Sequence, residues 1–125
     1  MLINLLRLFT PEIAHNITIQ ILKFNLTRYR KKTEEFHSLK QTILGIDFKN
    51  PLGLAAGFDK NAEVINSKLS YGFGFVEVGT ITPKPQRGNQ KPRIFRLLED
   101  EAVINHLGFN NLGSNKILKN LKSFY

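Results

Sequence analysis

Cysteine is absent from all 125 positions of this sequence. Disulfide bonds, thiolate metal sites and cysteine nucleophiles are therefore excluded, which suits a reducing compartment. Long apolar runs are missing too, and no segment approaches the roughly 20 apolar residues of a membrane-spanning helix. The apolar N-terminal stretch is interrupted at Arg7 and Pro11, and nothing basic precedes Leu2, so we expect no secretory signal.

Acidic residues are also scarce: 10 Asp and Glu stand against 18 Lys and Arg, a net charge of +8. This balance favours an anionic partner, whether nucleic acid, anionic lipid or an acidic small molecule. Hydrophobic residues make up 42% of the chain, which is enough for one modest globular domain. The basic loop at 81–93 carries prolines without interleaved aromatic residues, a poor stacking platform, so we expect no nucleic-acid partner.

Two short apolar helices are predicted at the N-terminus. Residues 2–9 have helical spacing of apolar side chains, and a second helix begins after Thr10, a predicted N-cap, with Pro11 at its first position. The predicted apolar face of this second helix consists of Ile13, Ile17, Ile21 and Phe24, broadened by Ala14 and Leu22. A basic cluster follows, made of Arg28, Arg30, Lys31 and Lys32. Two interpretations are open: a module lying in a membrane interface, or a helical hairpin packed on the main domain.

A strand–helix–strand unit is predicted in the middle of the chain. Strands over 52–56 and 75–78 flank a helix face of Ala62, Ile65 and Leu69, and this spacing predicts parallel strands. Hairpins over 43–48 and 94–104 and a last helix carrying Ile117, Leu118, Leu121 and Phe124 complete the predicted elements. A full eight-fold barrel takes about 250 residues. We therefore expect the beginning of an α/β enzyme and not all of one.

The candidate site lies where the predicted strands end. The stretch NPLGLAAGFDKN, Asn50 to Asn61, ends its strand in small residues followed by a charged pair. With Thr80 and the amide-rich segment 105–110, it offers bare backbone, a hydroxyl, a lysine and side-chain amides. That set suits a planar heterocycle bearing a carboxylate, and neither a serine–histidine pair nor a metal-ligand cluster is indicated. The simpler alternative is a turn that needs glycine only for its φ angle.

Three strings carry a resemblance to a known family: NPLGLAAGFDKNAE, GFGFVEVGTITPKPQRGNQKPRIFRL and NHLGFNNLG. Together they resemble quinone-dependent, class 2 dihydroorotate dehydrogenase. The resemblance implies the start of a (β/α)8 TIM barrel, its first two strands, preceded by a helical membrane-associating hairpin. It also implies bound FMN and the oxidation of (S)-dihydroorotate to orotate in de novo pyrimidine (UMP) synthesis, with a membrane quinone as acceptor.

The resemblance implies roles for individual residues. The implied FMN-binding residues are Ala56, Gly57, Phe58, Asp59, Lys60 and Thr80. The implied substrate-binding residues are Lys60, Asn105, His106, Leu107, Gly108 and Phe109. His15 and Arg96 match positions of the quinone tunnel. His106 departs from the family, which usually has arginine or another long residue there. The family's catalytic base is expected beyond residue 125, so no catalytic residue is assigned, and no metal site is assigned either.

Taken together, we expect an N-terminal membrane and quinone-tunnel module with its linker over 1–40, and an incomplete FMN-binding barrel over 41–125. The 125 residues alone are expected to be inactive, and the complete form to be a monomer on the cytoplasmic side of the cell membrane, peripherally bound. The alternative is a standalone membrane-surface or anionic-ligand binding module without catalysis.

Overall fold

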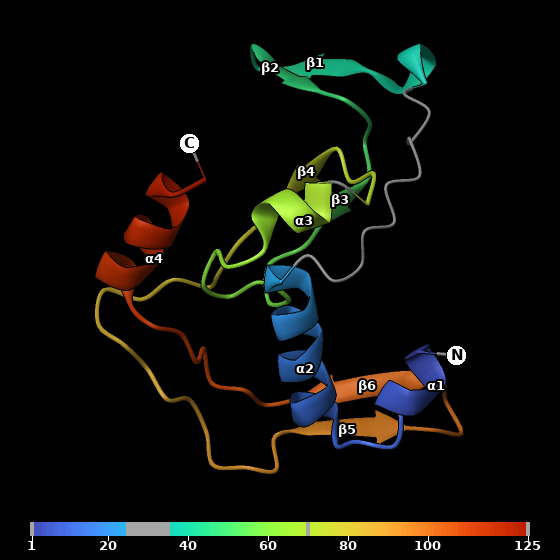
Figure 1. Cartoon of the computed structure of the whole chain (residues 1–125), viewed down its shortest axis with the longest axis vertical. Coiled ribbons are helices and arrows are strands. Elements are labelled where there is room, and N and C mark those ends of the chain that lie inside the picture. Colours follow the sequence, from blue (N-terminus) through green and yellow to red (C-terminus); the bar gives the residue numbers. More distant parts are fainter. Residues whose placement is uncertain (1, 25–35, 70, 125) are drawn as a thin grey trace.

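The computed structural model describes residues 2–24, 36–69 and 71–124. Its elements are, in order, α1 (Leu2–Leu6), α2 (Pro11–Lys23), the 3-10 turn η1 (His37–Leu39), β1 (Gln41–Ile43), β2 (Ile46–Phe48), β3 (Gly53–Leu54), α3 (Ile65–Leu69), β4 (Phe75–Val76), β5 (Ile94–Leu97), β6 (Ala102–Asn105) and α4 (Ser114–Lys122). The strands form three two-stranded sheets, spread along the molecule with α2 between the β3–β4 pair and the β5–β6 pair (Figure 1). The predicted basic cluster at 28–32 lies outside the described residues.

The parallel strand pair β3–β4 confirms the predicted strand–helix–strand unit. Gly53 pairs with Phe75 and Leu54 with Val76, and α3 lies between the strands in sequence. Glycine is required at 53 because a Cβ there would lie 2.1 Å from the Phe75 ring. Both strands are shorter than predicted, but backbone bonds continue beyond them, from Gly57 N–H to the carbonyl of Gly79 at 2.9 Å. The two segments therefore run together as far as the candidate site.

Both predicted hairpins are present. In β1–β2 the turn residues Leu44 and Gly45 have φ angles of 51° and 78°, and positive values at both positions match the strand twist of a two-residue hairpin. In β5–β6 the four pairs run from Ile94–Asn105 to Leu97–Ala102, and residues 98–101, three of them acidic, connect the two strands. Because these signals are local, the sequence was sufficient to predict them.

Helix α2 begins as predicted and buries Ala14 and Leu22 of the predicted apolar face, but it does not bury the predicted stripe. Thr10 stands at the N-cap with Pro11 after it, although the threonine side chain makes no capping hydrogen bond. The prediction of an Ile13–Phe24 stripe was wrong at both ends, because these two side chains are 48% and 72% exposed. The buried residues of α2 are Ala14, Ile19 and Leu22. Helix α1 also ends earlier than predicted, at Leu6.

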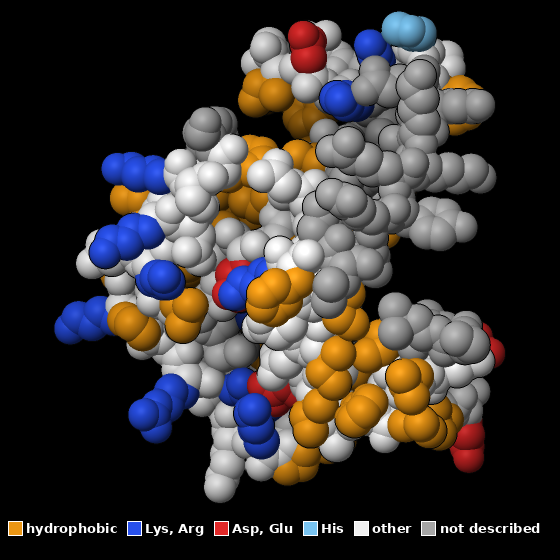
Figure 2. Space-filling model, viewed as in Figure 1, with side chains coloured by type: hydrophobic (Ala, Val, Ile, Leu, Met, Phe, Trp, Pro, Cys, Tyr) orange, Lys and Arg blue, Asp and Glu red, His pale blue; other side chains and the backbone are white. Residues whose placement is uncertain are grey.

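The buried core is small. Ile19 and Leu22 of α2 pack against Val64, and Phe58 lies against this cluster. The accessible surface of 9947 Å² exceeds the roughly 6800 Å² expected for a compact protein of this mass. Figure 2 shows hydrophobic side chains gathered on the surface around α1, β5 and β6, where Leu8, Leu98 and Val103 are 80%, 82% and 65% exposed. Many apolar side chains of these elements are therefore exposed to solvent and not buried in a core.

Candidate functional site

The turn after β3 places a lysine beside bare backbone. Lys60 is half-buried, and its Nζ donates to the carbonyl oxygen of Gly57 at 2.5 Å. Gly57 has φ +105°, and a Cβ built there would meet nothing within 4 Å. Open space therefore lies in front of the Gly57 backbone, where a flat molecule could approach closely.

Asp59 holds this turn in shape. Its side chain is 1% exposed, and its two carboxylate oxygens accept the backbone N–H groups of Glu63 and Val64, each at 2.8 Å. Its carbonyl accepts the N–H of Gly79 at 3.3 Å. The structure thus places the Asp59 carboxylate against its own loop, and its contribution to the site is the backbone that it orders.

The predicted substrate segment is held by the proline-bearing loop. Asn89 donates its backbone N–H to the carbonyl of Leu107 at 3.0 Å and its side-chain amide to that of His106 at 2.6 Å. Gln86 donates to the carbonyl of Gly108 at 3.1 Å. The close fit requires glycine at 108, because a Cβ there would lie 2.9 Å from Asn89. Three hydrogen bonds from this loop therefore hold the carbonyl oxygens of 106–108 in place.

Two side chains of this segment have their own supports. The ring of His106 stacks on Phe95, with centroids 5.7 Å apart and an interplanar angle of 14°. The side-chain oxygen of Asn105 accepts the N–H of Leu107 at 3.3 Å. Both side chains are exposed, so each is accessible to a ligand.

A small pocket of about 140 Å³ joins α2 to the turn and to the substrate segment. Its lining includes His15 from α2, Phe58 and Lys60 from the turn, and Leu107 and Asn110 from the segment. The side-chain oxygen of Asn110 is buried and accepts no hydrogen bond from the described residues. Such an acceptor is costly unless a donor reaches it. The pocket thus combines a cation with an unused acceptor.

Not every predicted residue lines this pocket. The ring of His15 meets that of Phe58 edge-on, with centroids 5.1 Å apart. Arg96 instead lines a groove of about 820 Å³ between the α1–α2 connection and the β5–β6 hairpin, and donates to the carbonyls of Arg7 and Phe9 at 3.1 and 2.8 Å. Ile94 lines both hollows. Outside the pocket lie Ala56, Gly57, Thr80, Asn105, His106, Gly108 and Phe109.

Burial and charge act together on Lys60. Burial lowers the pKa of its ammonium group below the usual 10.5, while the nearby Glu12 carboxylate acts in the opposite direction. A partly desolvated cation interacts more strongly with an anion than an exposed one does. The geometry therefore suits an anionic ligand held at Lys60.

Within 2–24, 36–69 and 71–124, no group of three His, Asp or Glu side chains is placed to hold a metal ion. Over the same ranges, no helix has the length and apolar character needed to cross a bilayer.

Comparison with known proteins gives the family. The family model described as dihydroorotate dehydrogenase matches residues 38–125, most of the chain. The chain belongs to the dihydroorotate dehydrogenase family. The resemblance of the three strings is confirmed, because similar curated proteins are named dihydroorotate dehydrogenase (quinone). One from Rhizobium etli (strain CIAT 652) is 54% identical over 116 residues, covering 93% of this chain and 32% of the relative. One from Rhizobium johnstonii is 58% identical over 106 residues, covering 85% and 29%.

Solved structures of dihydroorotate dehydrogenases agree. The enzyme from Eimeria tenella in complex with ferulenol has a TM-score of 0.87 at 47% identity, covering 92% of this chain and 30% of that structure. The ligand-free enzyme of the same organism has a TM-score of 0.86. The mixed α/β fold is thus that of dihydroorotate dehydrogenases. This chain spans about a third of the length of the curated relatives it matches.

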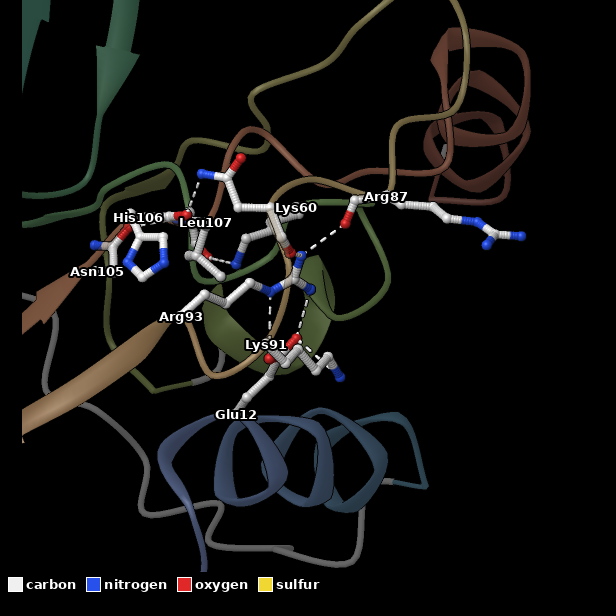
Figure 3. A network of polar contacts seen from close by, with 10 residues as sticks. Glu12, Lys60, Arg87, Lys91, Arg93, Asn105, His106 and Leu107 are labelled. Atoms are coloured by element: carbon white, nitrogen blue, oxygen red, sulfur yellow. Dashed lines mark hydrogen bonds and ion pairs between the residues drawn. The ribbon is translucent and has the colours of Figure 1, made fainter.

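The sequence did not predict the residues that hold the loops around the candidate site in place. Buried Arg93 and partly buried Glu12 form an ion pair, with Arg93 Nη2 and Glu12 Oε1 2.6 Å apart (Figure 3). Asn89 and Asn111 fix loop backbone through their side-chain amides. No local pattern in the sequence connects residue 12 to residue 93.

Proposed function

We propose that this protein oxidises (S)-dihydroorotate to orotate in de novo pyrimidine synthesis, with FMN bound and a quinone as acceptor. The observation that carries the proposal is the half-buried Lys60, held at the carbonyl of Gly57 beside open backbone and next to a pocket. The names of the relatives point to the same reaction. We propose further that the 125 residues supply the lysine and the substrate backbone, and that the base that removes the substrate proton comes from another segment.

The turn fits a flavin. Gly57 offers backbone without a side chain in front of it, and Ala56 and Thr80 flank it from the two strand ends. Ala56 to Lys60 and Thr80 would hold FMN, with Asp59 acting through the loop that it orders. When bound, FMN supplies the hydride acceptor.

The substrate would be held by charge and by amides. Lys60 has three N–H donors and uses one on Gly57, so it can also bind a carboxylate. Asn105 and the backbone of 106–109 would bind the ring, and the unused oxygen of Asn110 matches a ring N–H. These groups hold an anionic ring in one orientation, which is how positioning accelerates a transfer step.

The proposed surroundings of the site follow from the family. We propose that β3 and β4 are the first two strands of a (β/α)8 barrel over 41–125, and that 1–40 is a separate module at the cytoplasmic face of the membrane. Exposed Leu5, Leu8 and Phe9 support membrane contact. The groove at Arg96 and the pocket at His15 would admit the quinone. The complete enzyme would be a monomer.

A chimera tests the proposal. The matching third of the Rhizobium etli relative is replaced by this chain, and orotate formation from dihydroorotate is measured with a soluble quinone. We expect turnover in the chimera and none from the 125 residues alone. Lys60→Met should abolish turnover in the chimera, whereas Lys116→Met on α4 should preserve it. Equal activity of the two variants would contradict the assignment of Lys60, and turnover by the 125 residues alone would contradict the need for a further segment.

A further inference from the structure

Arg93 is a buried cation whose donors are shared between two parts of the chain. Its side chain is only 6% exposed. Nη2 and Nε donate to the two carboxylate oxygens of Glu12 at 2.6 and 3.3 Å, and Nη1 donates to the carbonyls of Arg87 and Asn89 at 2.6 and 3.0 Å. A planar guanidinium can meet a carboxylate with two bonds while its remaining donors bind elsewhere. Arg93 therefore joins α2 to the proline-bearing loop.

The same loop is hydrogen-bonded to the substrate segment. Asn89, whose carbonyl is held by Arg93, bonds to the carbonyls of both His106 and Leu107. The N–H of His106 in turn donates to the carbonyl of Arg93 at 3.1 Å. The loop also packs closely against the substrate segment, because a Cβ at Gly88 would lie 2.2 Å from the carbonyl oxygen of Leu107. Figure 3 shows Arg93 at the centre of this network, between Glu12 and the segment 105–107.

Helix α2 has a second, separate attachment that serves as a comparison. At its C-terminal end, Lys23 lies 2.5 Å from Glu63 in the loop before α3. This ion pair holds α2 to the turn around Asp59, a part of the chain other than 87–93. The two ends of α2 are thus attached to different halves of the candidate site.

We infer that the Glu12–Arg93 ion pair positions the substrate-binding backbone at 106–108 and makes that position depend on how α2 is docked. This rests on the proposed function and adds to it a pair of positioning residues outside the predicted site. A change at α2 would reach the substrate through Glu12 and its partners in the loop, Arg93 and the more exposed Lys91. From Arg93 the contacts continue to the backbone of His106, directly and through Asn89.

Amide hydrogen exchange on the full 125-residue chain tests the coupling. With the carboxylate neutralised in Glu12→Gln, we expect the N–H groups of Asn89 and His106 to exchange about tenfold faster. The N–H groups of Gln86 and Asn111, which bond to each other's carbonyls without Arg93, should change less than about twofold. Glu12→Asp, which keeps the charge, should recover part of the protection.

The matched control is Lys23→Gln, which breaks the other attachment of α2. It should leave exchange at Asn89 and His106 at the wild-type rate. Unchanged exchange in Glu12→Gln, or equal acceleration in Lys23→Gln, would overturn the inference. If Glu12→Gln does not fold, the comparison of Glu12→Asp with Lys23→Gln decides in the same way.

The chimera described above separates this inference from the proposed function. There Glu12→Gln should raise the KM for dihydroorotate about tenfold and change kcat less than about twofold, because a loosened binding segment weakens ground state and transition state alike. An unchanged KM would overturn the positioning role even where exchange is faster. A chimera without any turnover would count against the proposed function, and the exchange result would still decide the coupling.

Discussion

Asp59 and Lys60 are neighbours in sequence, but their side chains bond to different parts of the fold. Both residues line the pocket. Both carboxylate oxygens of Asp59 accept backbone N–H groups, whereas the Lys60 ammonium donates to the single carbonyl of Gly57. One residue shapes the turn and the other is available to a ligand. Substitution of Asp59 is therefore expected to lower the stability of the fold, and substitution of Lys60 to change ligand binding.

Asp59→Ala should cost about 3 kcal/mol of stability, because two buried N–H groups lose charged acceptors. Asp59→Asn keeps one acceptor and should cost less. Urea unfolding followed by far-ultraviolet circular dichroism measures both. Asp47→Ala is the control, since this carboxylate accepts an exposed bond from the Thr42 hydroxyl and its loss should cost about 0.5 kcal/mol. Equal losses for the two alanine variants would contradict the structural role of Asp59.

Lys60 should make anion binding sensitive to pH. Burial lowers the pKa of its ammonium group below 10.5, so the affinity of the chimera for orotate should fall as the pH rises through that lowered value. Replacing the group by a permanent cation, Lys60→Arg, should remove this fall even if it weakens binding. Orotate titrations across the alkaline range measure the effect. An identical pH profile in the two proteins would show that another group causes it.

Glu12 should contribute stability that is lost in acid. The hydrogen bond from Arg93 lowers the pKa of its carboxyl below 4.5. The ionised form is thus favoured in the folded state, so the contribution is present above 4.5 and disappears as the pH falls through the folded-state value. Between neutral pH and about pH 3, the urea midpoint should fall more in the wild type than in Glu12→Gln. Glu99→Gln, in the exposed turn of the β5–β6 hairpin, should behave like the wild type.

Two neighbouring residues of α4 should differ sharply. Ile117 is fully buried whereas Leu118 is 50% exposed. Ile117→Ala should therefore cost about 3 kcal/mol through lost burial and a residual cavity, and Leu118→Ala less than about 1 kcal/mol. Thermal unfolding of the two variants gives the comparison. Similar losses would mean that the other face of α4 is buried in solution.

The predicted α/β class, the parallel strand pair and both hairpins rest on local signals, and they are confirmed. The apolar face of α2 could not be predicted as securely. Isoleucines at 13, 17, 19 and 21 surround the helix, so apolar spacing allows more than one face. The packing of Ile19 and Leu22 against Val64 selected the buried one.

The sequence by itself determined the elements, the candidate turn around Lys60 and the family resemblance, because strand alternation, turn residues and motif strings are properties of adjacent positions. Only the tertiary structure decided how the site is held. Glu12 and Arg93 are separated by 81 positions, and an ion pair over that separation is set by the packing of α2 against the proline-bearing loop. No spacing or motif in the sequence identifies this glutamate and this arginine as partners. Their pairing exists because a buried guanidinium must have its charge and its N–H donors satisfied, and the fold brings Glu12 within reach.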